Sequence, residues 1–198
     1  MVTADLFGEP GLPEGFRFMA ELLDVPEEAA LLDIFRGLEF DEMRMRGVVA
    51  RRRVLHYGVH YSFETFRATP GPPIPDFLLP LRERAAAFGH VEADALREAL
   101  ITEYQPGATI GWHRDAAPFD RVIGISLASA CRFRFRRGKV RAWETREIVL
   151  PPRSAYLLDG SARREWEHSI PAVKDLRYSV TFRTLRQHGS GRAQPDRR

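Results

Sequence analysis

Three side chains of this 198-residue sequence have the types and the spacing of a metal site. His113 and Asp115 are two residues apart, so on an extended strand an imidazole and a carboxylate point to the same face. His168 follows in the run Trp166-Glu-His-Ser-Ile170. Two histidines and one carboxylate form the facial triad of non-haem iron, which leaves coordination positions open. Zinc with the same ligands is a chemical alternative, and a histidine packed in the core is the alternative without chemistry.

An arginine-containing strand begins nine residues beyond His168. In the run Arg177-Tyr-Ser-Val-Thr-Phe-Arg183, strand alternation places four polar side chains on one face: Arg177, Ser179, Thr181 and Arg183. Two guanidinium groups on one face suit a dicarboxylate, because arginine binds carboxylate with two parallel hydrogen bonds. A surface strand with a solvated basic face would show the same pattern. The short distance from His168 favours a binding role in the same cavity as the metal ligands.

The order of these motifs resembles that of the AlkB family over about residues 95–186. The resemblance rests on the run Ile101-Thr-Glu-Tyr-Gln-Pro-Gly-Ala-Thr-Ile-Gly-Trp-His-Arg-Asp115, on Trp166-Glu-His168 and on the arginine strand. The family's members are Fe(II)/2-oxoglutarate dioxygenases that demethylate N-alkylated nucleobases and release formaldehyde, succinate and CO2. The resemblance implies Fe(II), 2-oxoglutarate and O2 as cofactors. It also implies a mainly β, α+β fold, namely a double-stranded β-helix (jelly roll) with supporting N-terminal helices.

The resemblance assigns roles to individual residues. It makes His113, Asp115 and His168 the catalytic iron ligands. The co-substrate side chains would be Tyr104, Arg177, Ser179 and Arg183. Arg177 would bind the distal carboxylate of 2-oxoglutarate, and Tyr104 would donate a hydrogen bond to it. Arg183 would face the end of the co-substrate that chelates the metal.

Two departures from the family pattern concern the substrate. Repair members often carry an asparagine where this chain has Thr102. They also carry acidic residues, which help to recognise the damaged base, where this chain has Ala116 and Ala117. The metal and co-substrate assignments are unaffected, whereas the assignment of a nucleobase substrate is weakened.

A nucleic-acid substrate must be single-stranded or must present a flipped base, because a base inside a duplex cannot reach such a pocket. Binding then requires cationic groups and aromatic faces for stacking. The region 51–66 offers both and is predicted to form a substrate lid. The predicted substrate residues in it are Arg51, Arg53, His56, Tyr57 and Tyr61. The segment 132–137 is a second cationic candidate. Its alternation with Phe133 and Phe135 also fits an ordinary half-buried strand.

Three functions fit these observations. The first is a dealkylase of N-methylated bases in DNA or RNA, as in the repair of alkylation damage. The second keeps the oxygenase chemistry but acts on a protein side chain, a tRNA nucleoside or a small metabolite, which the alanines at 116 and 117 favour. The third is a jelly-roll binding module without turnover. The triad and the arginine strand together favour the two enzymes.

Several elements must position these residues. Asp24 is predicted to cap a helix that includes Pro26 and continues to about Leu38, and a second helix is predicted over 76–88, ended by Gly89. Strands are expected at 15–23, within 40–66, and at 99–104, 121–127, 132–136, 146–150, 155–158 and 178–185. The expected organisation is a flexible lead-in (1–14), helices, strands and a lid (15–94), a jelly-roll core (95–186) and a basic disordered tail (187–198).

Composition limits the remaining possibilities. The single cysteine, Cys131, excludes an internal disulfide framework and a cysteine-based zinc site. No secretory signal and no membrane-spanning run are recognisable, so we expect a cytoplasmic protein without a membrane partner. We also expect a monomer. The net charge of +3 is too small to identify a partner by itself.

Overall fold

The structure, a computed structural model, describes residues 11–45, 48–62 and 67–186. Side chains are described throughout these ranges except at 43–45, 48–50, 60–62 and 67–68. Most of the predicted lead-in (1–10) and the predicted basic tail (187–198) therefore lie outside the described residues. No helix in the described ranges is long and apolar enough to span a bilayer.

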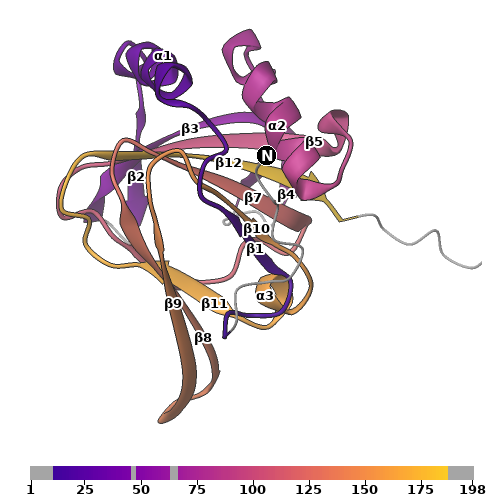
Figure 1. Cartoon of the computed structure of the whole chain (residues 1–198), viewed down its shortest axis with the longest axis vertical. Coiled ribbons are helices and arrows are strands. Elements are labelled where there is room, and N and C mark those ends of the chain that lie inside the picture. The colour runs from indigo at the N-terminus through magenta and orange to yellow at the C-terminus, as the bar shows by residue number, and fades with distance from the viewer. Residues whose placement is uncertain (1–10, 46–47, 63–66, 187–198) are drawn as a thin grey trace, which may run out of the picture.

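Two antiparallel sheets form the body of the molecule (Figure 1). The larger sheet has the strand order β1-β10-β7-β12-β5-β3-β2, with β4 paired to β3, and the smaller has the order β6-β11-β8-β9. The strands are β1 (Phe16–Met19), β2 (Asp41–Met45), β3 (Val48–Ser62), β4 (Arg67–Pro70), β5 (Leu96–Tyr104), β6 (Ile110–His113), β7 (Phe119–Leu127), β8 (Cys131–Lys139), β9 (Ala142–Leu150), β10 (Ala155–Leu158), β11 (Glu167–Ile170) and β12 (Arg177–Leu185). This is the double-stranded β-helix expected from the resemblance.

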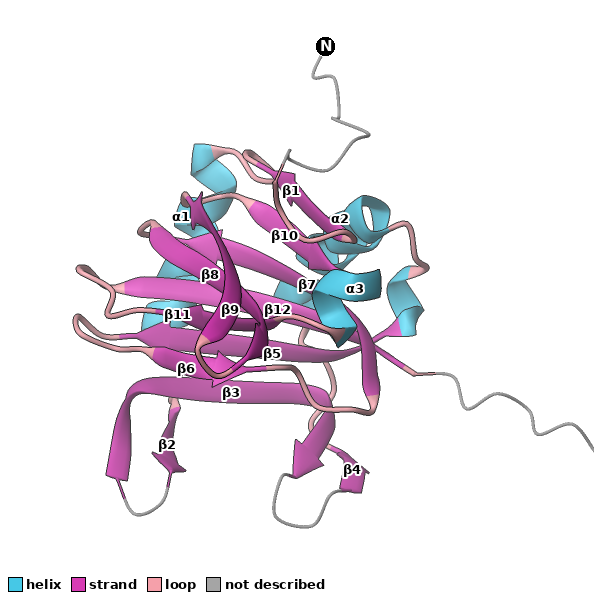
Figure 2. Ribbon diagram, turned by 90° about the horizontal axis from the view of Figure 1, so that it is seen from below, coloured by secondary structure: helices cyan, strands magenta, loops and turns pink. Residues whose placement is uncertain are grey.

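Apolar side chains divide into two cores, one on each face of the large sheet. The first lies under α1 (Val25–Arg36) and α2 (Leu79–Gly89) and contains the alternating strand residues Tyr178, Val180 and Phe182. The second contains Phe133 and Phe135 of β8 and lies between the sheets. Figure 2 shows the small sheet crossing in front of the large one, with β2 and β4 at the two ends of β3. Residues of β12 that face away from the helices therefore point between the sheets.

The first predicted helix is confirmed, with Asp24 as its cap. The Asp24 carboxylate accepts a hydrogen bond from the Glu27 backbone N–H, and the Glu27 carboxylate accepts one from the Asp24 N–H. This reciprocal capping box satisfies two backbone donors that a helix start would otherwise leave unpaired. Leu31 and Phe35 bury the inner side of the helix against the large sheet.

The second helix is confirmed, but its predicted end is wrong. A 3-10 turn, η1 (Asp76–Leu78), leads into α2, which includes Gly89, and the left-handed capping residue is His90, with φ of 50°. Gly89 has a packing role instead, because a Cβ added there would lie 2.4 Å from Cδ1 of Ile123. The glycine lets the last turn of α2 approach β7 closely.

All the predicted strands are present, but five short elements were not predicted. They are the strands β4, β6 and β11, the 3-10 turn η2 (Ala93–Ala95) and the helix α3 (Gly160–Arg164). Two of them carry the proposed metal ligands, since β6 ends at His113 and β11 contains His168. Each of these two strands has only four residues, too few for alternation to be recognised.

Candidate active site

The two histidines and the aspartate lie together between the sheets. His113 and His168 are directly paired across β6 and β11, and their ring centroids are 4.3 Å apart. Asp115 follows the end of β6, and its Oδ2 lies 3.6 Å from Nε2 of His168. The structure therefore gathers side chains that are 55 residues apart in the sequence.

Burial and charge hold these groups in the protonation states that a cation requires. Burial lowers the pKa of His168 to about 3, against the opposing effect of Asp115, so the imidazole is neutral. Burial would raise the pKa of Asp115, but Arg183 and the neighbouring histidines outweigh it and keep that pKa below its ordinary value. One neutral imidazole and one carboxylate thus face each other at neutral pH.

A row of buried charges runs from Asp115 into the large sheet. Arg183 directs Nε and Nη2 at Oδ1 of Asp115, at 2.9 and 2.7 Å, and donates from Nη1 to Oε2 of Glu98 at 2.6 Å. Burial would raise the pKa of Glu98, but Arg183 and His56 hold it below its usual value. The row therefore reads carboxylate, guanidinium, carboxylate.

Arg177 is a buried cation without a carboxylate partner among the described residues. It is 1% exposed, and its Nε and Nη1 have no hydrogen-bond partner. Its other nitrogen, Nη2, donates to the hydroxyl of Ser126 at 3.1 Å, and its guanidinium carbon lies 4.6 Å from the centre of the Tyr104 ring. Beside it, the Tyr104 and Ser179 hydroxyls are 3.3 Å apart. Two unsatisfied buried donors are costly, and an acceptor such as a carboxylate would satisfy both.

The donor atoms around the triad suit a divalent cation. Oδ2 of Asp115 is buried and makes no hydrogen bond. Nδ1 of His113 donates to the Gly111 carbonyl at 3.0 Å, which leaves the lone pair of Nε2 for a metal. Within the described ranges, no three histidine, cysteine or acidic side chains are already arranged so that they could hold a metal ion. The donor set fits, while the side chains are not closed around an ion.

The five predicted substrate residues on β3 do not all face this site. Strand alternation places Arg51, Arg53 and Tyr57 on the helix side of the sheet, where Arg53 pairs with Glu103 and Tyr57 packs on the first core. His56 faces the other way, with Nδ1 at 3.5 Å from Oε1 of Glu98. Tyr61 lies on β3, but its side chain is outside the described residues.

Two charged residues near the site, Glu98 and Arg163, were not predicted from the sequence. Glu98 gave no recognisable signal, because its partner Arg183 is 85 residues away. Arg163, on α3, is 4% exposed and donates from Nη2 to the carbonyls of Ala116 and Phe119, at 2.8 Å each. Arg163 thereby anchors the loop that follows Asp115.

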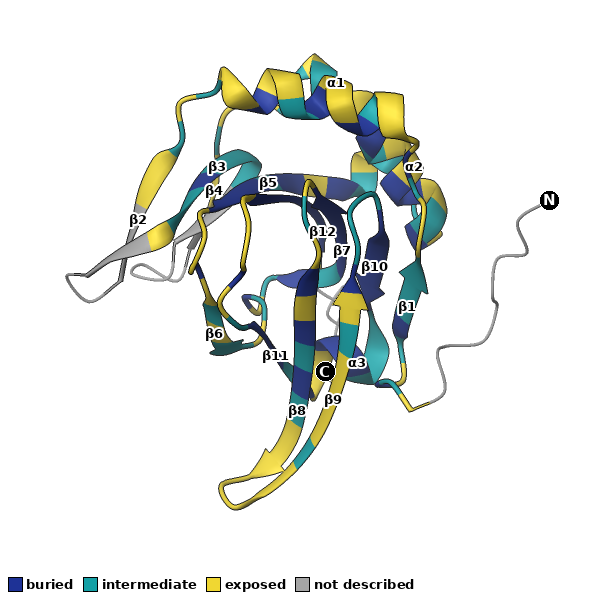
Figure 3. Cartoon of the chain, turned by 60° about the vertical axis from the view of Figure 1, so that its left-hand side comes forward, coloured by how far each residue is buried: buried dark blue, intermediate teal, exposed yellow. Residues whose placement is uncertain are grey.

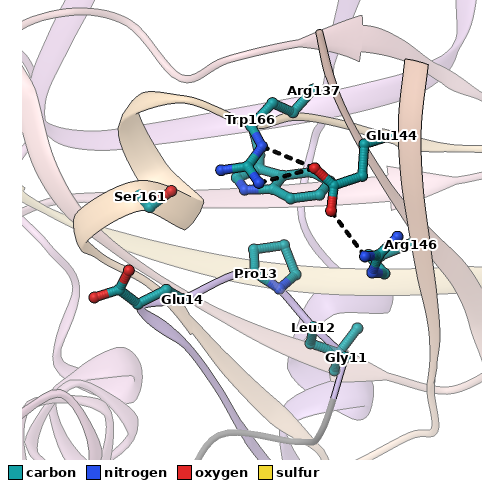
Figure 4. A pocket seen from close by; sticks show the side chains of 9 residues that line it. All are labelled: Gly11, Leu12, Pro13, Glu14, Arg137, Glu144, Arg146, Ser161 and Trp166. Carbon is teal, nitrogen blue, oxygen red and sulfur yellow. Dashed lines mark hydrogen bonds and ion pairs between the residues drawn. The ribbon is translucent and has the colours of Figure 1, made fainter. Parts of the chain in front are cut away.

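A cavity of about 210 Å³, away from the triad, contains none of the predicted site residues (Figure 4). It lies between Gly11–Glu14 and the β8–β9 hairpin, with Trp166 in its wall. Glu144 pairs with Arg137 and Arg146 along one side. The cavity offers no histidine, so it is a less suitable metal site than the space between the sheets.

Comparison with known proteins identifies the family. The sequence model of the 2OG-Fe(II) oxygenase superfamily matches residues 35–192, which include every strand except β1 and the whole candidate site. The chain belongs to this superfamily. It is accordingly an oxidoreductase, and the family implies Fe(II) and 2-oxoglutarate as cofactors with O2 as co-substrate. The predicted oxygenase chemistry is therefore confirmed at the level of the superfamily, and the alternative of a jelly-roll binding module without turnover is not supported.

Relatives place the chain among AlkB-like members of the superfamily. It is 30% identical over 210 residues to the alkylated DNA repair protein ALKBH8 homolog of Arabidopsis thaliana, covering 88% of this chain and 59% of that protein. It is 27% identical over 174 residues to the tRNA (carboxymethyluridine(34)-5-O)-methyltransferase ALKBH8 of Mus musculus, covering 84% of this chain and 26% of that protein. The chain thus spans less than two thirds of the length of each of these relatives.

Solved structures share the fold of this oxygenase. OsALKBH1 superposes with a TM-score of 0.65 at 13% identity, covering 87% of this chain and 97% of that one. A 2OG-Fe(II) oxygenase family oxidoreductase from Burkholderia pseudomallei gives a TM-score of 0.62 at 18% identity, covering 87% of this chain and 86% of that one. The AlkB-like double-stranded β-helix is therefore established for this chain.

Proposed function

We propose that this oxygenase removes methyl groups from N-alkylated nucleobases in single-stranded DNA or RNA. His113, Asp115 and His168 hold Fe(II), and Arg177 binds the distal carboxylate of 2-oxoglutarate, assisted by Tyr104. The single observation that carries the co-substrate assignment is the buried Arg177, whose Nε and Nη1 lack acceptors. A dicarboxylate bound there would extend along the face that Arg177 shares with Ser179 and Arg183 toward the triad.

Bound iron supplies the activation of O2, coupled to decarboxylation of 2-oxoglutarate to succinate and CO2. The chain's own contribution is binding, orientation and exclusion of water. Arg177 fixes one end of the co-substrate, and Arg183 holds Asp115 through two hydrogen bonds to Oδ1. The hydroxylated N-methyl group then leaves as formaldehyde, which restores the unmodified base.

A nucleic-acid substrate is supported by the charge and aromatic content of the β8–β9 hairpin, which projects from the body of the molecule (Figure 3). Residues 131–150 contain seven arginines or lysines and two glutamates, a difference of +5, whereas the whole chain carries +3. Arg136 lies 4.6 Å from the Trp112 ring and 4.3 Å from the exposed Trp143 ring. Alternating indole and guanidinium groups are suited to stacking on unpaired bases.

Ion pairs moderate this surface. Arg132 pairs with Glu147 and Arg136 with Glu167, so part of the positive charge is neutralised. Arg134 donates instead to the uncharged Ser169 hydroxyl at 3.1 Å. The hairpin therefore supports general electrostatic attraction of a phosphate backbone.

The proposal is tested with the chain loaded with Fe(II), 2-oxoglutarate and single-stranded DNA or RNA oligonucleotides containing 1-methyladenine or 3-methylcytosine. We expect loss of one methyl group per modified base by mass spectrometry, together with formaldehyde and succinate in equal amounts. Intact oligonucleotides with confirmed iron loading would contradict the nucleobase assignment. A His113→Ala variant is the control for adventitious oxidation.

A modified tRNA nucleoside is the second candidate substrate. Two observations favour it: the mouse relative is named for tRNA, and alanines at 116 and 117 replace the acidic residues of repair members. The same assay with total tRNA separates the two candidates. Succinate formation that responds to tRNA but not to methylated oligonucleotides would favour this alternative over repair.

A further inference from the structure

Glu98 is a buried acid whose charge the proposed chemistry does not require directly. It is 2% exposed and lies on β5 directly opposite Arg183 of β12. Its Oε2 accepts the hydrogen bond from Nη1 of Arg183 at 2.6 Å, and its Oε1 faces Nδ1 of His56 at 3.5 Å. Burying a carboxylate costs free energy unless charged partners compensate. The partners Arg183 and His56 offset the cost of burying the Glu98 carboxylate, so Glu98 places a fixed negative charge beside Arg183.

The geometry of Arg183 shows what that charge holds in place. One arm of the guanidinium is taken by Glu98, and the other two donors converge on a single oxygen of Asp115, Oδ1. The second oxygen, Oδ2, is left buried, without a hydrogen bond, 3.6 Å from Nε2 of His168. Arginine often binds both oxygens of a carboxylate at once. Here Arg183 binds only one oxygen of Asp115, Oδ1.

We infer that Glu98 is a positioning residue that holds Arg183 so that Asp115 presents one oxygen, Oδ2, to the metal. The inference rests on the proposed metal site. A single-oxygen contact keeps one coordination position more available for 2-oxoglutarate and O2 than a two-oxygen contact would.

Charge balance supports the same role. The charges of Asp115 and Arg183 alone sum to zero. A positively charged guanidinium next to a metal ligand repels a divalent cation and so weakens its binding. Glu98 restores a net negative charge to the row and neutralises Arg183 on the side away from the metal. Residues that orient metal ligands through hydrogen bonds typically contribute about 10- to 100-fold in metal affinity.

The test is Glu98→Gln, which keeps the shape of the side chain and removes its charge. The readout is the dissociation constant of Co(II), measured by calorimetry without co-substrate, together with the visible d–d spectrum of the bound ion. We expect about 10- to 100-fold weaker binding and a changed spectrum, since Arg183 can then engage both oxygens of Asp115.

Glu103→Gln is the matched control. Glu103 lies on the same strand, is 4% exposed and is paired with Arg53, but it faces the helix side of the sheet. Its loss should cost stability and leave the Co(II) affinity and spectrum unchanged. An equal loss of Co(II) affinity in both variants would overturn the inference, because it would show a general effect of lost stability.

Arg183→Lys provides an independent variant if Glu98→Gln does not fold. It keeps a positive charge but cannot contact Glu98 and Asp115 together, so it should also weaken Co(II) binding. In the double variant the two losses should be less than multiplicative, because both act through one contact. Multiplicative losses, or wild-type affinity in Glu98→Gln, would overturn the inference.

His113→Ala distinguishes failure of this inference from failure of the metal site. If His113→Ala weakens Co(II) binding while Glu98→Gln does not, the site stands and the role of Glu98 is wrong. If His113→Ala has no effect on Co(II) affinity, the proposed site itself is wrong, and the inference falls with it.

Discussion

Replacing Arg177 with methionine should weaken the binding of 2-oxoglutarate strongly and change the free energy of unfolding very little. Removing one partner of a buried ion pair lowers the free energy of unfolding by about 3–5 kcal/mol, because the other charge is left buried and unpaired. Arg177 differs, because Nε and Nη1 lack partners and its contacts are one hydrogen bond to Ser126 and the face of Tyr104. Methionine fills a similar volume without a charge.

The magnitudes follow from those contacts. Removal of unsatisfied donors returns about 1–3 kcal/mol, while the lost hydrogen bond and cation–π contact cost about 1 kcal/mol each. The free energy of unfolding of the metal-free protein should therefore change by less than about 1 kcal/mol. Two charge-assisted hydrogen bonds to a carboxylate contribute about 1.5–3 kcal/mol each. Their loss should raise the dissociation constant of 2-oxoglutarate by about 100-fold or more.

Calorimetric titration with 2-oxoglutarate in the presence of Mn(II), and urea denaturation of the metal-free protein, measure the two quantities. Arg163→Met is the control for stability. Arg163 is also buried, but it bonds two backbone carbonyls, so its replacement should cost about 1–3 kcal/mol. Unchanged affinity for 2-oxoglutarate in Arg177→Met, or a loss of stability equal to that of Arg163→Met, would refute the reasoning.

Three further outcomes are expected. His113→Ala should abolish iron-dependent succinate formation while the circular dichroism spectrum stays the same; residual turnover at the wild-type rate would exclude His113 as a ligand. Gly124→Ala should lower the free energy of unfolding by about 1–3 kcal/mol, measured in urea, because the added Cβ would lie 2.2 Å from Cζ of Tyr156; a neutral substitution would show that the ring does not need that space. Trp143→Ala should weaken binding of a single-stranded oligonucleotide by about 1–3 kcal/mol, measured by fluorescence anisotropy, and wild-type binding should weaken as salt rises; salt-independent binding would argue against contact through the arginines.

Strand alternation correctly predicted which side of the sheet the β12 side chains face, because β12 carries an unambiguous pattern. Tyr178, Val180 and Phe182 are buried under the helices, so Arg177 and Arg183 had to face the other side. On β3 the same rule failed to select the right face. Polar residues occupy both faces of that strand, so nothing in the sequence shows which alternate set faces the cavity, and Arg53 and Tyr57 lie on the helix side.

The proposed metal ligands were selected by their chemical type rather than by their secondary structure. β6 and β11 are each four residues long and show no clear alternation. Asp115 lies just beyond the end of β6, so strand alternation only partly explains why it points to the same side as His113. Glu98 could not be predicted at all, because a glutamate beside Arg97 resembles a surface acid until β12 pairs with β5.

Anaerobic addition of 2-oxoglutarate to the Fe(II)-loaded chain tests most directly whether the triad and Arg177 form one site. We expect the visible charge-transfer absorption of a chelated Fe(II)–2-oxoglutarate complex, with one equivalent bound. It should be lost in His113→Ala and in His168→Ala, and in Arg177→Met it should require much higher concentrations of 2-oxoglutarate. The same absorption at the same concentration in all three variants would show that iron and 2-oxoglutarate bind elsewhere.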